Sequence, residues 1–95
     1  MARPAIHPGE HLADELKARD LTASELARRL RVPTNRITLV INGHRHITAD
    51  TALRLAHYFG TSAEFWLNLQ ALYDLRVAER HAGWRIRRLP TLQTA

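Results

Sequence analysis

The 95-residue sequence contains no cysteine and only one lysine. Without cysteine the chain forms neither a disulfide bond nor a thiolate metal site, and cysteine usage does not indicate a redox compartment. No run of 18 or more apolar residues is present, which argues against a membrane-spanning helix. The first residues do not have the pattern of a signal peptide. We therefore expect a soluble cytoplasmic protein that makes no use of a membrane.

The chain length provides for one domain with one core. A chain of 95 residues buries roughly 60–65% of the surface that it exposes when unfolded. Such a domain is only moderately stable by itself, and dimerisation would be a natural way to bury more apolar surface.

Arginine carries nearly all of the positive charge. The sequence has 14 basic and 9 acidic residues, a formal net charge of +5, and Lys17 is its single lysine. Five arginines and one acid lie between residues 22 and 47, and four arginines without any acid lie between residue 80 and the C-terminus. A GC-rich coding bias would raise the arginine content without any function. The clustering, however, favours contact with phosphate groups.

Apolar periodicity and capping residues predict five helices and no strand, an all-α fold. The capping box of Thr22 and Glu25 marks the start of the second helix, and Pro33 suits the first turn of the third. The expected helices cover residues 8–19, 22–31, 33–42, 48–60 and 61–81. The residues expected to face inward from the first four are Leu12, Leu16, Leu26, Ala27, Leu30, Ile37, Val40, Ile41, Leu53, Leu55, Ala56 and Phe59.

The second and third helices, joined by a short Val-Pro turn, form a helix-turn-helix pattern in a small basic domain. The exposed face of the third helix carries Asn35, which can pair with adenine through two hydrogen bonds, and Arg36, which can pair with guanine. Thr34 and Thr38 can bond to base edges or phosphates. Phosphate contacts are expected from residues at the ends and flanks of the unit, namely Thr22, Arg28, Arg29 and Arg45. The less specific alternative is a solvated helix face without a partner.

Several sequence blocks resemble one family. The run from Thr22 to Gly43 resembles the phage-repressor-type helix-turn-helix proteins, with Ala23 where many of them carry a phosphate-binding glutamine and Leu39 at an often polar position. The blocks HPGE (7–10), NGHR (42–45), ITADTALRLA (47–56) and FGTS with WLNLQ (59–62 and 66–70) resemble the HigA antitoxins. The match covers about residues 6–78.

The resemblance implies a five-helix lambda-repressor-like fold and a bacterial type II antitoxin. Such a protein would neutralise a HigB-like, RelE-type toxin that cleaves mRNA, and would bind double-stranded operator DNA as a dimeric repressor of its own operon. It would act at the nucleoid and have neither a cofactor nor a metal ion. A stand-alone repressor without a toxin, or a toxin-binding protein that no longer binds DNA, is an alternative.

The fifth helix is apolar on more sides than an ordinary surface helix. One stripe would pack on the domain, and the other would need a cover. We expect a homodimer interface formed by Trp66, Leu69, Tyr73 and Val77. The alternative is that the tail folds back over this helix.

We expect residues 82–95 to form a basic tail outside the domain of residues 1–81. Trp84, Ile86 and Leu89 alternate with arginines, which favours an extended segment packed on the fifth helix. The alternative is a mobile basic arm that becomes ordered on DNA or toxin.

The segment His7-Pro8-Gly9-Glu10-His11 matches the letters of the H-x-x-E-H zinc-protease motif. That chemistry needs both histidines on one face of a continuous helix. Proline and glycine fit the start of a helix better than its interior, so we expect a helix start here and no enzyme activity.

Overall fold

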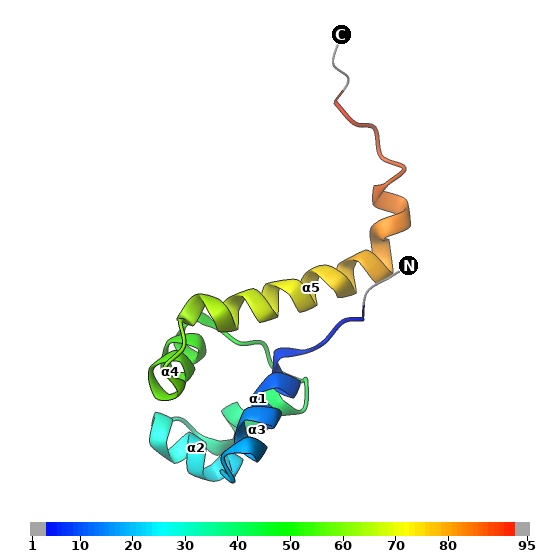
Figure 1. The fold of residues 1–95 in the computed structure, drawn as a ribbon. Coiled ribbons are helices and arrows are strands. Elements are labelled where there is room, and N and C mark those ends of the chain that lie inside the picture. Colours follow the sequence, from blue (N-terminus) through cyan, green and yellow to red (C-terminus); the bar gives the residue numbers. More distant parts are fainter. Residues whose placement is uncertain (1–3, 93–95) are drawn as a thin grey trace.

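Five α-helices make up the computed structural model, which describes residues 4–92 and contains no strand among them (Figure 1). The fold is all-α, as predicted. The helices are α1 (Pro8–Ala18), α2 (Ala23–Leu30), α3 (Thr34–Ile41), α4 (Ala49–Phe59) and α5 (Ala63–Ile86). None of the helices within residues 4–92 is long and apolar enough to cross a membrane.

Four of the five helices begin at a side chain that accepts a hydrogen bond from the first turn. At α1 the acceptor is His7 Nδ1, 2.9 Å from the Gly9 amide nitrogen. At α2 both halves of the predicted capping box are present. The capping residues of α1, α2, α4 and α5 are His7, Thr22, Thr48 and Ser62. Helix α3 follows Pro33 and has no side-chain cap.

The turn between α2 and α3 is held by the backbone. Arg31 adopts a left-handed conformation with φ 58° and ψ 46°, and the Val32 amide then donates to the Ala27 carbonyl at 3.0 Å. This closure ends α2. Pro33 starts α3 at once, so the two helices are joined by only three residues.

The core is formed by side chains from all five helices, and the first half of α5 packs on α4 and α1. Its fully buried side chains include Leu12, Leu26, Ile37, Val40, Leu55 and Trp66. Helix α1 comes very close to the end of α3, because a Cβ added to Gly9 would lie 1.9 Å from the Val40 carbonyl oxygen. The prediction that Leu53 supplies core contacts is wrong, since its side chain is 63% exposed. Leu53 lies about 200° around α4 from the buried Leu55, on the opposite face.

Trp66 belongs to the core of its own domain. Its side chain is 0% exposed, and its indole N–H donates to Thr61 Oγ1 at 2.9 Å. The prediction that Trp66 contacts a second copy is therefore wrong. Leu69, Tyr73 and Val77 are partly buried, and Tyr73 meets the His7 ring edge-on with centroids 4.8 Å apart.

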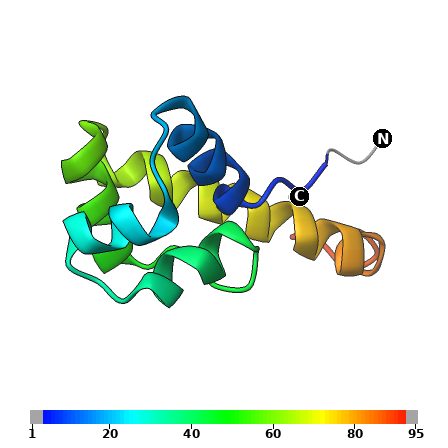
Figure 2. The same cartoon turned by 90° about the horizontal axis from the view of Figure 1, so that it is seen from below.

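Helix α5 continues beyond the predicted end at residue 81. Its 24 residues correspond to roughly 36 Å, and its C-terminal part extends past the other helices (Figures 1 and 2). Trp84 and Ile86 lie within this helix and are 54% and 57% exposed, and Leu89 just beyond it is 59% exposed. The prediction of an extended segment packed on α5 is therefore wrong.

The helix passes the predicted boundary because residues 82–86 contain no residue that must break a helix. The first proline after Pro33 is Pro90. Residues 1–3 of the predicted domain and residues 93–95 of the predicted tail lie outside the described residues.

Candidate nucleic-acid interface

The outer face of α3 carries polar side chains opposite a buried apolar face. Ile37 and Val40 are buried in the core, while Thr34 and Asn35 are exposed. Within residues 4–92 the Asn35 side chain forms no hydrogen bond, so its amide has both a donor and an acceptor to offer a ligand. Thr38 is partly buried, and its hydroxyl lies 3.4 Å from the carbonyl oxygen of Thr34. Such a distance marks a weak bond to the preceding turn.

Thr22, predicted to contact phosphate, is bound closely to Glu25. Its hydroxyl accepts from the Glu25 amide at 3.1 Å and donates to Glu25 Oε1 at 2.9 Å, and its own amide donates to the same oxygen. The bonds from the Thr22 backbone and side chain lower the pKa of the Glu25 carboxyl. Thr22 thus fixes the start of α2.

The arginines around the unit differ in how firmly they are held. Arg29 Nη1 lies 2.5 Å from the Tyr58 hydroxyl, to which it donates, and the guanidinium lies 5.9 Å from the centre of the Tyr58 ring. Arg28 on α2 and Arg45 in the loop after α3 are exposed. Arg45 lies in the loop four residues after the last residue of α3, and Arg29 is tied to α4.

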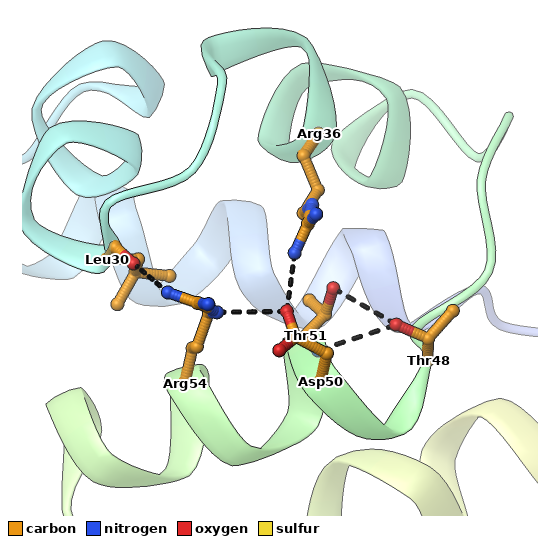
Figure 3. A network of polar contacts seen from close by, with 6 residues as sticks. All are labelled: Leu30, Arg36, Thr48, Asp50, Thr51 and Arg54. Carbon is orange, nitrogen blue, oxygen red and sulfur yellow. Dashed lines mark hydrogen bonds and ion pairs between the residues drawn. The ribbon is translucent and has the colours of Figure 1, made fainter.

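Arg36 is engaged with another helix. Its Nη1 donates to Asp50 Oδ2 at 2.5 Å, and Arg54 Nε donates to the same oxygen at 2.9 Å. Arg54 also donates through Nη1 to the Leu30 carbonyl oxygen at 2.7 Å (Figure 3). The hydrogen bonds from Arg54 and then Arg36 lower the pKa of the Asp50 carboxyl, so the carboxylate stays ionised at neutral pH.

The sequence reasoning missed the partners of these residues. Asp50 is the acidic residue in the first turn of α4, a place that the helix dipole favours without any partner. The spacing of Asp50 and Arg54 by four residues indicates an ion pair within one helix, but nothing in the pattern connects either residue to Arg36. Gln70 was missed as well. Its Oε1 accepts from the Ile47 amide at 2.8 Å and ties the loop before α4 to α5.

The two histidines of the H-x-x-E-H segment have separate roles. His7 caps α1 through Nδ1 and is 7% exposed, and its Nε2 has no hydrogen-bond partner within residues 4–92. The His11 ring packs edge-on against Phe65 and Trp66, with centroids 5.2 Å and 5.6 Å away. Among residues 4–92 no group of three or more potential ligands is arranged to hold a metal ion.

Comparison with known proteins places the chain among helix-turn-helix proteins. The family model described as helix-turn-helix matches residues 12–66. Virulence-associated protein I of Dichelobacter nodosus is 54% identical over 78 residues, which are 81% of this chain and 72% of that protein.

Two solved structures share nearly the whole fold. A HigA-family addiction module antidote protein from Coxiella burnetii superposes with a TM-score of 0.93 at 52% identity, covering 96% of this chain and all of that one. The antitoxin HigA of Pseudomonas aeruginosa, solved with the higBA promoter, superposes with a TM-score of 0.90 at 41% identity, covering 95% of this chain and all of that one. The chain therefore belongs to the HigA family of helix-turn-helix antitoxins.

Proposed function

We propose that this protein is the antitoxin of a type II toxin–antitoxin pair, which represses its own operon by binding operator DNA and neutralises a HigB-like toxin that cleaves mRNA. The single observation that carries the DNA-binding part is the exposed polar face of α3. The opposite, apolar face of this helix packs into the core, and the helix belongs to a basic helix-turn-helix unit. The similarity to an antitoxin solved with its promoter supports it. The toxin partner rests on membership of the family.

In this proposal α3 lies in the major groove and Asn35 is the principal base-reading residue. A carboxamide matches the paired donor and acceptor that adenine presents there. Thr34, exposed in the first turn of α3, and Thr38 contact neighbouring base edges or phosphates. Arg45, Arg29 and the N-terminus of α2 at Thr22 contact the phosphates on either side and fix the register.

A dimer would place two such helices on one side of the DNA. Two half-sites read from one face are about 34–36 Å apart. Leu72 and Leu75 on α5 are 49% and 53% exposed, and exposed leucines on neighbouring turns are typical of an interface. We propose that Leu69, Tyr73 and Val77, which lie within about 80° of one another around α5, form the surface that contacts a second copy, with the exposed Leu72 at its edge. Leu75 lies about 200° from Val77, on the opposite side of the helix.

The DNA-binding part is tested by fluorescence anisotropy with DNA from directly upstream of the gene and with a shuffled sequence of the same length. Asn35→Ala should weaken operator binding by about 1–3 kcal/mol, roughly 5- to 150-fold, and relax the sequence preference. The matched control is Asn68→Ala, which removes the same exposed amide from α5 and should leave binding unchanged. Equal operator affinity for Asn35→Ala and the unmodified protein would exclude the groove assignment.

The phosphate contacts are tested by the salt dependence of the same binding curve. Arg45→Ala should weaken binding to all sequences alike and lower the slope of log K against log salt by about 1. A loss confined to one sequence would show that Arg45 reads bases.

The toxin part is tested first by looking for a gene for a small basic ribonuclease-like protein beside this one, and then by co-expressing the two proteins. The absence of such a gene would favour a stand-alone repressor. Neutralisation predicts that growth recovers and that a purified complex no longer cleaves mRNA. Operator binding together with unrelieved mRNA cleavage would identify a stand-alone repressor. Relief of cleavage without any operator binding would identify a toxin-binding protein only.

A further inference from the structure

We propose that Arg36 is a positioning residue that acts through Asp50 and does not read bases. In this proposal, Asp50 holds the recognition helix α3 at a fixed angle to α2 and α4. The inference rests on the proposed DNA-binding function and changes the role expected of Arg36 from the sequence, where a guanine contact was predicted.

The direction of the side chain is the first argument. Successive residues of a helix project about 100° apart, so Arg36 lies between the outer face that carries Asn35 and the buried face that carries Ile37. Figure 3 shows the Arg36 side chain extending from α3 toward α4. Only 26% of this side chain is exposed, although it is long and charged. It lies along the side of the helix and is directed away from the outer face.

The second argument is that one carboxylate oxygen joins three helices. Asp50 Oδ2 on α4 accepts from Arg36 on α3 at 2.5 Å and from Arg54 at 2.9 Å. Arg54 then donates at 2.7 Å to the carbonyl of Leu30, the last residue of α2. Carbonyls in the last turn of a helix lack partners within the helix. Arg54 therefore ties the end of α2 to the carboxylate that holds α3.

The third argument concerns what such a tie can achieve. Ion pairs between exposed groups contribute little to folding stability, and Asp50 is 55% exposed. A base contact, by contrast, requires side chains held within about 0.5 Å of the productive geometry. The short turn after α2 and the apolar contacts of Ile37 and Val40 fix one side of α3, and the Arg36–Asp50 pair fixes the side facing α4.

The test is a double-mutant cycle of Arg36→Ala and Asp50→Asn. The quantity measured is the ratio of affinities for operator DNA and for shuffled DNA of the same length, because this ratio cancels the general effect of changing one charge. Each single variant should lower the ratio by a similar factor, about 3- to 30-fold, as is typical of coupled residues in contact. The double variant should lower this ratio by no more than one single variant does.

Three further measurements separate positioning from folding and from base reading. The melting temperatures of the variants should stay close to that of the unmodified protein. Selection from a randomised operator library should give a base preference that is weaker at every position of the half-site. Asp50→Glu, which keeps the carboxylate, should retain more of the ratio than Asp50→Asn. The matched control is Glu64→Gln, which removes an acid from the first turn of α5 and should leave the ratio unchanged.

Two results would overturn the inference. In one, Arg36→Ala loses its preference at a single base pair while Asp50→Asn keeps the ratio of operator to shuffled affinity. This result would show that Arg36 reads that base. The other is a double variant whose loss is the product of the two single losses. If the unmodified protein does not distinguish operator from shuffled DNA, the proposed function fails as well. If the proposed function holds, the unmodified protein instead distinguishes the two DNAs and loses this distinction in Asn35→Ala. In that case a double-mutant cycle without coupling overturns only the role of Arg36 and Asp50.

Discussion

Two tryptophans on one helix provide a direct test of where the core ends. Trp66 is 0% exposed and Trp84 is 54% exposed, although both lie on α5. Truncating a buried tryptophan to alanine costs about 3–5 kcal/mol, and the bond to Thr61 adds about 1 kcal/mol. Thr61 is itself exposed, so its hydroxyl can bond to water when the indole is absent.

For a domain of this size a loss of 1 kcal/mol lowers the melting temperature by roughly 4–8 °C. With a loss of about 4–6 kcal/mol, Trp66→Ala should therefore melt roughly 16–48 °C below the unmodified protein, or be unfolded at room temperature. Trp66→Phe keeps an aromatic ring and should lose about 1–2 kcal/mol. Trp84→Ala should change the melting temperature by only a few degrees.

The measurement is thermal and urea unfolding followed by circular dichroism at several protein concentrations. If Trp66→Ala were as stable as Trp84→Ala and differed from the unmodified protein only in forming monomers, Trp66 would lie in a dimer interface and the assignment to the core would be refuted.

Three other residues give predictions for stability. Gly9→Ala should cost about 1–3 kcal/mol or more in urea unfolding, because its Cβ would overlap the Val40 carbonyl. A Cβ at Gly83 would meet the end of the flexible Arg87 side chain and, at an ordinary 3.8 Å, Glu79 Cβ, so Gly83→Ala should not destabilise. Equal effects of the two substitutions would show that α1 and α3 can separate freely. Burial, and then the charge of His46, hold the pKa of His7 below 6.5 in the folded protein. As the pH drops, the unfolded state therefore takes up a proton before the folded state does. The free energy of unfolding should fall as the pH drops through 6.5 toward the lowered pKa. This fall should be smaller in His7→Asn, which keeps a capping oxygen, and an identical pH profile would rule out His7 as its source. Thr22→Ala should cost about 1 kcal/mol through loss of the cap, and an unchanged urea midpoint would mean that water replaces it.

The sequence predicted the elements of this fold well because their signals are local. Capping residues such as Thr22 and Ser62 act on amides within three residues, and the periodicity of Ile37 and Val40 is a property of one helix. The family resemblance supplied the way in which the five helices pack together, a lambda-repressor-like fold.

The errors concern contacts between helices. Leu53 and Leu55 are equally apolar, and only the packing of α4 determines which of them is buried. The two stripes of α5 could not be ranked for the same reason, so Trp66 was assigned to an interface. The partner of Arg36 lies 14 residues away on another helix, a distance at which no helical periodicity applies. The predicted end of α5 failed because nothing between residues 82 and 86 forces a helix either to stop or to continue.

The length of α5 divides this helix into two parts that should exchange their amide hydrogens at very different rates. Around Trp66 and Gln70 the helix is covered by the domain, so its amides should open only when the whole domain unfolds. Near Trp84 and Ile86 the side chains are largely exposed, and opening there costs little beyond a few helical hydrogen bonds. Protection from exchange should therefore decline along α5 toward Ile86, and any molecule that covers its C-terminal turns would extend the slowly exchanging region outward by the length that it contacts.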